Sequence, residues 1–439
     1  MDINELKRKR VSAISLGCDK NRVDLEKMLY NLKNFGFTVT EDIENCDMLI
    51  VNTCSFISSA IDEAVQTIFL ALDLKKENKV EKVIVTGCLV NRFSDEINYL
   101  LNEVDCFIQV KDNDQIINKI LELYEVEGNY TFKNGRLLTT LPHYAYLKIA
   151  DGCNNGCAYC TIPRIRGRYK SVAMDILLNE AKELAKQGVK ELILVAQDIT
   201  RYGIDIYNRY ALIDLIKELS KIKNIQWIRL LYCYPEMVTD ELLKEIQSNP
   251  KVCKYIDIPL QHIDNTILTN MNRHSSEEQV LNLINNIRQN YPEIAIRSTF
   301  IIGFPGETRK QFNKLLTFLQ NAKLNNVGFF PYFKEEKTKA YFMKKQVPNF
   351  IKQMRLKKAQ KVQEKIMNAN NINLIGSQTQ VIIDYYDNDV GCFVGRTIQN
   401  APDVDFYIFF DDSSSIKVGE IYNAKIIDYF NGLFKGELI

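Results

Sequence analysis

The sequence has almost no net charge and no long apolar run. Its 56 Lys and Arg residues are matched by 55 Asp and Glu residues, which gives a formal charge of +1. This balance excludes a polybasic protein that binds nucleic acid over its whole surface. No run of about 18 apolar residues occurs, so we expect no transmembrane helix and no membrane partner.

The N-terminal segment also lacks the apolar core of a signal peptide. The Lys-Arg cluster that follows Glu5 has no such core behind it, so we expect a cytoplasmic protein. The 439 residues are enough for two to four domains of ordinary size. With 46% apolar and 25% charged residues, the composition is that of a soluble globular protein.

Cysteine, in contrast, is frequent. The chain has 11 cysteines, which is an odd number. In a long chain without a secretory signal, disulfides explain such a count poorly, and metal or redox chemistry explains it better. A single cysteine can also serve as a small buried hydrophobic residue. Position and spacing must therefore decide the role of each one.

Residues 1–125 alternate between short apolar runs and amphipathic stretches. Runs at 11–16, 48–51 and 82–85 predict strands, and the stretches between them predict helices. This alternation is typical of an open parallel α/β sheet. A cysteine follows each strand directly. Because ligands bind beyond the carboxyl ends of the strands in such sheets, we expect Cys18, Cys54 and Cys88 to meet at one edge.

Residues 126–141 contain turn-forming Asn and Gly and predict a linker. Residues 142–370 contain six further strand-like runs, and helical stretches follow most of them. This pattern predicts a partial (β/α)6 barrel, short of the eight units of a complete TIM barrel. The six runs are 146–149, 191–196, 227–231, 255–258, 296–302 and 327–332.

Residues 371–439 contain five short β-like runs separated by turn residues, which predicts a small antiparallel barrel like an OB-fold. This segment has four basic and ten acidic residues, a net charge of −6, and the rest of the chain carries +7. A net-negative barrel repels phosphate and attracts a basic protein. The same carboxylates can equally serve only to keep the surface soluble. The five runs are 381–384, 391–396, 406–410, 421–428 and 433–438.

The segment Asp151–Cys160 carries the strongest signal. Cys153, Cys157 and Cys160 fall within eight residues, and two glycines allow the loop to curl around one centre. Thiolate groups in this arrangement hold iron–sulfur clusters. A closed zinc site usually needs a fourth ligand, and no further Cys or His is nearby. Three thiolates on a four-iron cluster leave one iron open for a substrate or cofactor.

This cysteine spacing, with the aromatic Tyr159 before the last cysteine, resembles the radical S-adenosylmethionine (SAM) superfamily. The resemblance implies that SAM binds the open iron and is cleaved to methionine and a 5′-deoxyadenosyl radical. It extends to 195–198 and 298–308, which match strand ends that line the SAM pocket in relatives. Tyr159 and Gln197 are the cofactor-binding residues that it implies.

The order of the three segments resembles the methylthiotransferase family, in which a C-terminal TRAM domain follows the radical SAM domain. The resemblance implies a second 4Fe–4S cluster on Cys18, Cys54 and Cys88, which carries a sulfide. One SAM would methylate this sulfide, and another would generate the substrate radical. The implied electron donor is a protein such as a flavodoxin or ferredoxin. No catalytic residue beyond the cluster ligands can be assigned.

The family has two branches, which modify either adenosine 37 of transfer RNA or the β-carbon of an aspartate in ribosomal protein S12. Segments 52–57, 394–397 and 401–405 resemble the protein-modifying branch, and the acidic barrel agrees with a basic protein substrate. The RNA branch remains the alternative, because Lys334–Lys365 holds eleven basic residues against three glutamates. A non-catalytic iron–sulfur scaffold that docks on the ribosome is a third, less favoured reading.

The remaining five cysteines lie in or beside apolar runs without paired spacing, and we interpret them as core residues. They are Cys46, Cys106, Cys233, Cys253 and Cys392.

Overall fold

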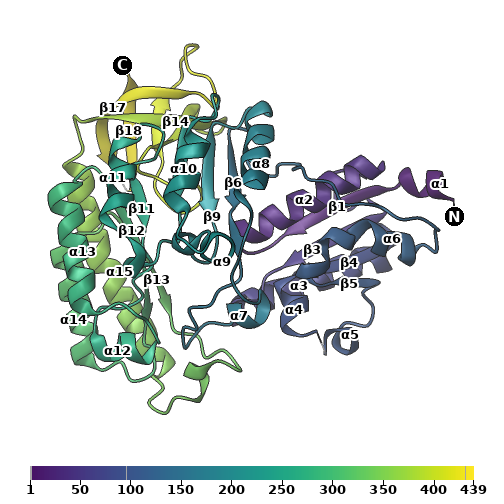
Figure 1. The fold of residues 1–439 in the computed structure, drawn as a ribbon, viewed down its shortest axis with the longest axis horizontal. Helices are drawn as coiled ribbons and strands as arrows, with labels where there is room; N and C mark the ends of the chain where they lie inside the picture. Colours follow the sequence, from purple (N-terminus) through teal and green to yellow (C-terminus); the bar gives the residue numbers. More distant parts are fainter. Residues whose placement is uncertain (1, 95, 431) are drawn as a thin grey trace. The chain divides into compact units, whose positions relative to one another are not determined.

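The computed structural model describes residues 2–94, 96–430 and 432–439. It divides into two compact units (Figure 1). Within the described residues, no helix is both long and apolar enough to cross a membrane. Unit 1 consists of Met1–Thr140, Asp151–Asn154 and Cys160–Lys170, and unit 2 consists of Leu141–Ala150, Asn155–Tyr159 and Ser171–Ile439.

Unit 1 contains a parallel sheet with the strand order β2-β1-β3-β4-β5. Its three longest strands are the three that the sequence predicts. The outer strands β2 and β5 have two and three residues, too short for an apolar pattern to reveal. The strands are β1 (Arg10–Ser15), β2 (Thr38–Val39), β3 (Met48–Thr53), β4 (Lys82–Gly87) and β5 (Cys106–Ile108).

Helices cover both faces of this sheet. One hydrophobic cluster contains Ile68 of α3, and the other contains Leu29 of α2 and Ile117 of α6. The strand order reverses between β1 and β3, which is where doubly wound sheets bind ligands. The helices are α1 (Ile3–Lys7), α2 (Asp19–Phe35), α3 (Ser58–Lys76), α4 (Cys88–Arg92), α5 (Ile97–Leu100), η1 (Val110–Gln115) and α6 (Ile116–Leu123).

Unit 2 contains the six predicted barrel strands as two parallel sheets, β10-β9-β6 and β11-β12-β13. Backbone hydrogen bonds bring the sheets together: Cys253 N donates to Ile228 O at 2.9 Å, and Cys233 N donates to Asp257 O at 2.8 Å. The partial (β/α)6 barrel is therefore confirmed. Its strands are β6 (Tyr144–Lys148), β9 (Glu191–Val195), β10 (Trp227–Leu230), β11 (Tyr255–Asp257), β12 (Ala295–Ile302) and β13 (Asn326–Pro331).

Amphipathic helices flank these strands on the outside (Figure 1). The short strands β7 (Ala150–Asp151) and β8 (Lys170–Ser171) pair with each other, and α7 (Ile162–Ile165) lies between them in the chain. The remaining helices are α8 (Met174–Lys186), η2 (Ile199–Arg201), α9 (Ile204–Tyr207), α10 (Leu212–Ser220), η3 (Pro235–Met237), α11 (Asp240–Ser248), α12 (Asn265–Asn270), α13 (Glu277–Asn290), α14 (Arg309–Ala322), η4 (Lys339–Phe342) and α15 (Asn349–Ile372).

The C-terminal segment forms the predicted five-stranded barrel, closed in the order β14-β15-β16-β18-β17. Four of its five pairings are antiparallel, and β16 with β18 is parallel. An odd number of strands cannot alternate in direction around a closed ring, so one parallel pairing is unavoidable. The strands are β14 (Gln378–Asp387), β15 (Cys392–Thr397), β16 (Ile408–Asp411), β17 (Ile421–Phe430) and β18 (Leu433–Leu438).

A buried ion network joins this barrel to the start of β9. Arg396 contacts Glu191 at 2.8 Å and Asp384 at 2.7 Å, and Arg229 contacts Glu191 at 2.6 Å. His143 Nε2 lies 2.8 Å from Asp384. Burial alone would raise the pKa of the Glu191 carboxyl, but the Arg396 and Arg229 guanidiniums hold it below its usual value. The network therefore fixes the barrel at the amino ends of the unit 2 strands.

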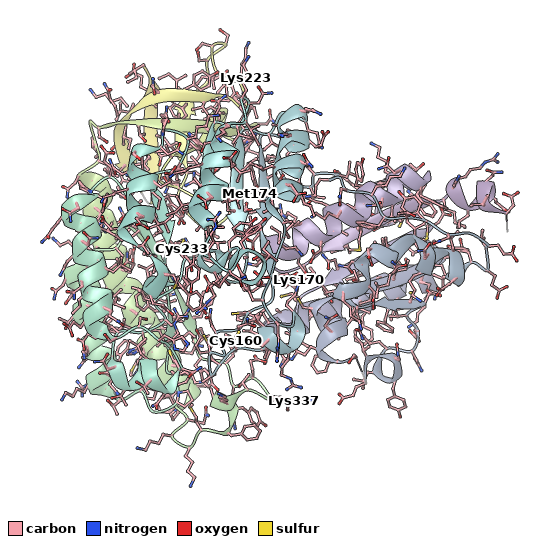
Figure 2. All side chains as sticks on the ribbon, viewed as in Figure 1. Cys160, Lys170, Met174, Lys223, Cys233 and Lys337 are labelled. Atoms are coloured by element: carbon pink, nitrogen blue, oxygen red, sulfur yellow. The ribbon has the colours of Figure 1, made fainter. Side chains whose placement is uncertain are left out.

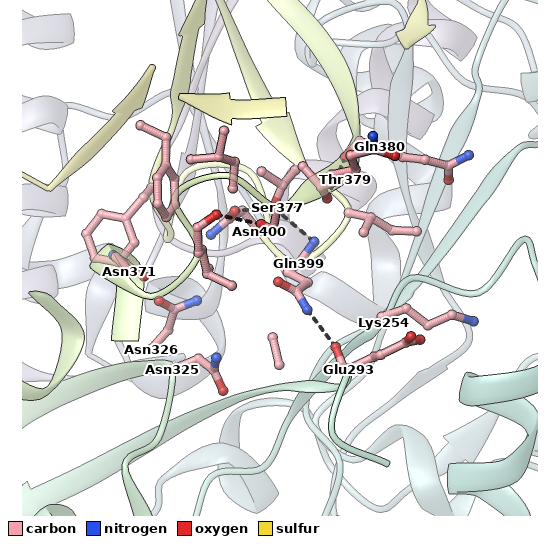
Figure 3. A pocket seen from close by; sticks show the side chains of 18 of the residues that line it. Lys254, Glu293, Asn325, Asn326, Asn371, Ser377, Thr379, Gln380, Gln399 and Asn400 are labelled. Atoms are coloured by element: carbon pink, nitrogen blue, oxygen red, sulfur yellow. Dashed lines mark hydrogen bonds between the residues drawn. The ribbon is translucent and has the colours of Figure 1, made fainter. Parts of the chain in front are cut away.

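The segment 401–405, which suggested a substrate class from the sequence, belongs to the same junction. Arg297 contacts Asp405 at 2.6 Å, and the Tyr146 hydroxyl donates to Asp403 at 3.3 Å. Beside the junction lies a cavity of about 410 Å³, lined largely by amide and hydroxyl side chains and by no cysteine (Figure 3). Gln399 donates to Glu293 O across it at 2.6 Å. This segment therefore acts in domain packing.

Replacement of Glu191 by Gln should destabilise unit 2. It would leave two buried guanidiniums without their shared carboxylate, and breaking a buried ion pair costs about 3–5 kcal/mol. Denaturant unfolding followed by circular dichroism measures this change. The matched control is Glu183→Gln, which removes one partner of the exposed Glu183–Lys186 pair. We expect an unchanged unfolding midpoint for the control, and equal midpoints for both variants would contradict the role of the network.

Candidate functional site

Three cysteines stand at the carboxyl ends of three neighbouring strands of unit 1, as predicted. Cys18 precedes α2, Cys54 follows β3, and Cys88 begins α4. The strand ends are level, because Ser15 pairs with Asn52 and Thr53 pairs with Gly87. Cys18 is exposed, whereas Cys54 and Cys88 are buried. The site is therefore open to solvent at Cys18 and closed behind it.

Two glycines allow the chain segments that carry these thiols to approach closely. Gly17 has φ +90°, and a Cβ there would lie 2.8 Å from Cys54 Sγ. Gly87 has φ +98°, and a Cβ there would lie 2.4 Å from Thr53 O. Any larger residue would both strain the backbone and push the segments apart. These glycines are therefore part of the site.

Burial favours the protonated form of the Cys54 and Cys88 thiols while no metal is bound. It raises the pKa of Cys88 to about 11, against the opposing effect of the Arg166 guanidinium. Burial also raises the pKa of Cys54, and the neighbouring Cys18 thiolate adds to that increase. Metal binding requires thiolates, so it would release protons here.

The second cysteine group occupies the loop between β7 and α7. Cys153 and Cys160 belong to unit 1, and Cys157 belongs to unit 2. Cys153 and Cys157 are buried, whereas Cys160 is partly exposed. The Ile162 N–H donates to Cys160 Sγ at 3.4 Å, so the start of α7 orients this thiol. Figure 2 marks Cys160 in the loop before this helix.

The sequence alone did not single out the side chains that surround Cys157. Its Sγ lies 3.5 Å from the Tyr234 hydroxyl and 3.9 Å from Arg273 Nη1. The buried Arg273 guanidinium also lies over the Tyr234 ring, 4.2 Å from its centroid. Both residues come from loops without a recognisable motif, so only the folded chain reveals them. They place a positive charge beside a thiol that must ionise to bind metal.

The two predicted cofactor-binding residues lie at loop positions of unit 2. Tyr159 packs edge-on against Phe304, with 6.4 Å between the ring centroids. Gln197 lies two residues after the end of β9 and is partly buried. Its neighbour Asp198 accepts a hydrogen bond from Asn155 Nδ2 at 3.0 Å, which ties the cysteine loop to this strand end. Contact of Tyr159 or Gln197 with SAM remains a prediction.

The residues present fit iron–sulfur clusters in their chemistry. No disulfide joins any of the eleven cysteines, all of which lie in the described part of the chain, and thiolates are the ligands that such clusters take. Within the described part of the chain, no three Cys, His, Asp or Glu side chains are already arranged to hold a metal ion. Of the five cysteines assigned to the core, Cys46, Cys233, Cys253 and Cys392 are buried, and Cys106 is partly buried.

Family comparisons match each of the three segments. The Radical SAM superfamily matches residues 147–319, and the TRAM domain matches residues 375–439. Uncharacterized protein family UPF0004 matches residues 10–109, which contain the three strand-end cysteines. The matches follow the predicted order along the chain.

Curated relatives extend over nearly the full length. The chain is 44% identical to "Ribosomal protein uS12 methylthiotransferase RimO" of Clostridium botulinum, over 95% of both chains. It is 41% identical to the protein of the same name from a Thermoanaerobacter species, over 98% of this chain and 100% of the relative. The chain belongs to the RimO family of radical SAM methylthiotransferases. It is therefore a transferase, and an iron–sulfur cluster and SAM follow from its family.

Solved structures support the fold of this RimO family member. The radical SAM methyltransferase TsrM of Kitasatospora setae, solved with cobalamin and a 4Fe–4S cluster, aligns with a TM-score of 0.56 at 13% identity. The alignment covers 76% of this chain and 77% of TsrM. The cobalamin-dependent SAM radical enzyme OxsB aligns with a TM-score of 0.51 at 12% identity, over 82% of this chain and 57% of OxsB. At these identities the likeness concerns the fold alone.

Alkylation of Cys88 in the metal-free enzyme should keep accelerating far above neutral pH. The pKa of this thiol is raised to about 11, and only the thiolate reacts with iodoacetamide. The reactive fraction should therefore grow about tenfold per pH unit up to that pKa. Peptide mass spectrometry at several pH values gives the rate. An unfolded cysteine peptide levels off near its ordinary pKa of about 8.5, and the same plateau at Cys88 would contradict the burial effect.

Proposed function

We propose that this enzyme transfers a methylthio group to the β-carbon of an aspartate in ribosomal protein S12. One SAM would serve as methyl donor and a second as radical source. The observation that carries the proposal is 41–44% identity, over at least 95% of both chains, to relatives named as uS12 methylthiotransferases. Such coverage includes all three segments and therefore the parts that select the substrate.

Two 4Fe–4S clusters are part of this proposal. Cys153, Cys157 and Cys160 would hold the radical SAM cluster. The three strand-end thiols of unit 1, Cys18, Cys54 and Cys88, would hold the second one. When bound, these groups and SAM supply a hydrogen-abstracting radical and a methylated sulfur.

The chain's own residues would ligate the clusters, exclude water and orient SAM. The buried Cys54 and Cys88 close the inner side of the N-terminal site, and the exposed Cys18 leaves its outer side accessible. Around Cys157, the Tyr234 hydroxyl and the Arg273 guanidinium contact the sulfur and displace solvent. Tyr159 and Gln197 would contact SAM from the cysteine loop and from the end of β9.

The C-terminal barrel would present an acidic surface to the basic S12 protein. Asp405 and Glu420 pair with Arg297 and Lys190 of the radical SAM segment. Asp384 is buried against Arg396 of the barrel and His143, so these three carboxylates do not contribute to that surface. Asp389 and Asp412 remain exposed, and the exposed Asp411 pairs with Lys435 of the barrel itself. The exposed side chains Tyr385 and Val390 lie on the same β14–β15 hairpin as Asp389. Carboxylates mixed with apolar groups are suited to a basic protein surface.

A transferase acting on tRNA is the second candidate, supported by the Lys-rich segment. Its two exposed phenylalanines, Phe342 and Phe350, are 75% and 72% accessible and available for stacking on a base. Lys352 and Arg355, by contrast, are engaged with Tyr332 O and Glu307. The nine exposed lysines are Lys334, Lys337, Lys339, Lys344, Lys345, Lys357, Lys358, Lys361 and Lys365.

We also propose a domain organisation for the chain. It has three domains at 1–125, 142–370 and 371–439, and residues 126–141 are the linker between the first two. The linker is tied to α2, since Arg136 forms a buried ion pair with Glu26. The enzyme would act in the cytoplasm and would receive electrons from a flavodoxin or ferredoxin.

The substrate is tested by offering an S12-derived protein and unmodified tRNA to the anaerobically reconstituted enzyme. With SAM, sulfide and a reductant present, we expect a methylthio group on the aspartate and none on the adenosine, as detected by mass spectrometry. Modified adenosine alone would overturn the proposal in favour of the RNA branch. SAM cleavage would exclude the non-catalytic scaffold.

The same assay tests the acidic surface. Asp389→Asn combined with Asp412→Asn should raise the KM for S12 several-fold at low salt and leave SAM cleavage unchanged. The reason is that screened surface charges act mainly on association. Glu183→Gln combined with Glu241→Gln, at exposed positions of α8 and α11, is the charge-matched control. An unchanged KM in the double aspartate variant would remove the barrel from substrate docking.

Cys18→Ala should reduce the iron content of the reconstituted enzyme by about half, because one of two four-iron clusters loses a ligand. Cys392→Ala, which removes a buried thiol from β15, is the control and should retain all iron. Iron is measured against protein concentration after gel filtration. Equal iron in the two variants would show that the N-terminal cluster is wrongly assigned.

A further inference from the structure

Arg166 lies six residues after Cys160, yet its guanidinium is buried among residues of α2. Its Nη1 contacts Asp24 at 2.6 Å and Asp151 at 3.1 Å, and its Nη2 donates to Asn21 Oδ1 at 2.5 Å. Only 2% of the side chain is exposed. A planar guanidinium can serve these partners together, which the single ammonium of a lysine cannot do.

Asn21, the partner of Arg166, connects the ends of all three cysteine-bearing strands. Its Nδ2 donates to Leu16 O at 3.0 Å, beyond β1, and to Thr53 O at 2.8 Å, at the end of β3. Its Oδ1 lies 3.8 Å from the thiol of Cys88, which follows β4. The side chain is 1% exposed. One buried amide therefore sets the spacing of the three segments that carry thiols.

The chain beside Arg166 is anchored to the same region. Asn91 of α4, the helix that begins with Cys88, donates from its Nδ2 to Ile165 O at 2.8 Å. The segment that follows the second cysteine group is thus fastened to the first group at two successive residues. Two independent contacts make this attachment more than a single surface ion pair.

We propose that Arg166 is a positioning residue for the N-terminal cysteine site. Through Asn21 it fixes the three strand ends around the bound cluster, and its positive charge makes that cluster easier to reduce. This inference rests on the proposed assignment of Cys18, Cys54 and Cys88 as cluster ligands.

The charge effect follows from the surroundings of Arg166. Asp24 and Asp151 contact Nη1 of the guanidinium, and the thiols of Cys88 and Cys54 lie near enough to feel its charge. Without the guanidinium, two carboxylates would face a cluster that becomes more negative on reduction. Cluster potentials respond to net charge and hydrogen bonding of this kind. Loss of the charge should therefore disfavour the reduced state.

The experiment uses the full chain with Cys153, Cys157 and Cys160 all replaced by Ala, so that only the N-terminal site can be loaded. In this background we compare Arg166→Gln, Arg166→Lys and Asn21→Ala with the control Arg168→Gln. Arg168 is exposed and carries the same charge two residues away. Iron per chain, the EPR spectrum of the reduced cluster and its midpoint potential are measured for each variant.

We expect Arg166→Gln to lower the reduction equilibrium constant about tenfold, which is a shift of about 59 mV to more negative potential for one electron. Arg166→Lys should retain most of the potential but change the EPR spectrum, because it keeps the charge and loses the bond to Asn21. Asn21→Ala should change the spectrum in the same way. Arg168→Gln should match the parent in all three measurements.

The outcomes separate this inference from the proposed function. If the triple cysteine variant binds no iron, the assignment of Cys18, Cys54 and Cys88 as cluster ligands is itself refuted. Iron binding with the same potential and spectrum in Arg166→Gln and Arg168→Gln would refute the role of Arg166 alone. Lower thermal stability of Arg166→Gln with an unchanged potential and spectrum would also refute it, since that result describes a purely structural residue.

Discussion

The hydrogen bonds of the buried Asn21 amide hold together the strand ends on which the N-terminal site depends. Register alone places the ends of β1, β3 and β4 at one level, but parallel pairing does not fix the loops that follow. Asn21 ties two of these loops directly and approaches the third at Cys88. Because the amide is buried, each of its bonds costs free energy when it is lost. The geometry of the thiols therefore follows from one side chain on α2.

Much of this arrangement could be predicted from local sequence patterns. Apolar runs predicted the three cysteine-bearing strands, all six strands of the partial barrel and the five of the small barrel. They could do so because a buried strand has a recognisable pattern of apolar residues in its sequence. Cysteine spacing and strand-end position indicated both candidate sites. The partners Asn21, Arg166 and Arg273 could not be predicted, because their roles arise from contacts between residues far apart in the chain and no short motif encodes such contacts.

The net charge of the C-terminal barrel describes its surface charge only in part. The net charge of −6 includes Asp405, which pairs with Arg297 across the junction, whereas Asp384 pairs with Arg396 of the barrel itself. The segment 401–405 likewise serves domain packing. A sequence cannot show which carboxylates have a partner from another segment, so surface charge must be counted after folding. The exposed carboxylates that remain include those of Asp389 and Asp412.

The single parallel pairing in the C-terminal barrel has a consequence for how the chain acquires its shape during synthesis. Strand β18 emerges after β17, yet it inserts between β16 and β17 in the closed ring. The facing edges of β16 and β17 must therefore stay open until β18 is available, and open strand edges invite pairing with other chains. Strands β15, β16 and β17 can each pair with an earlier strand as they emerge, because β17 pairs with β14. Closure of the ring must nevertheless wait for β18, which fills the gap between β16 and β17.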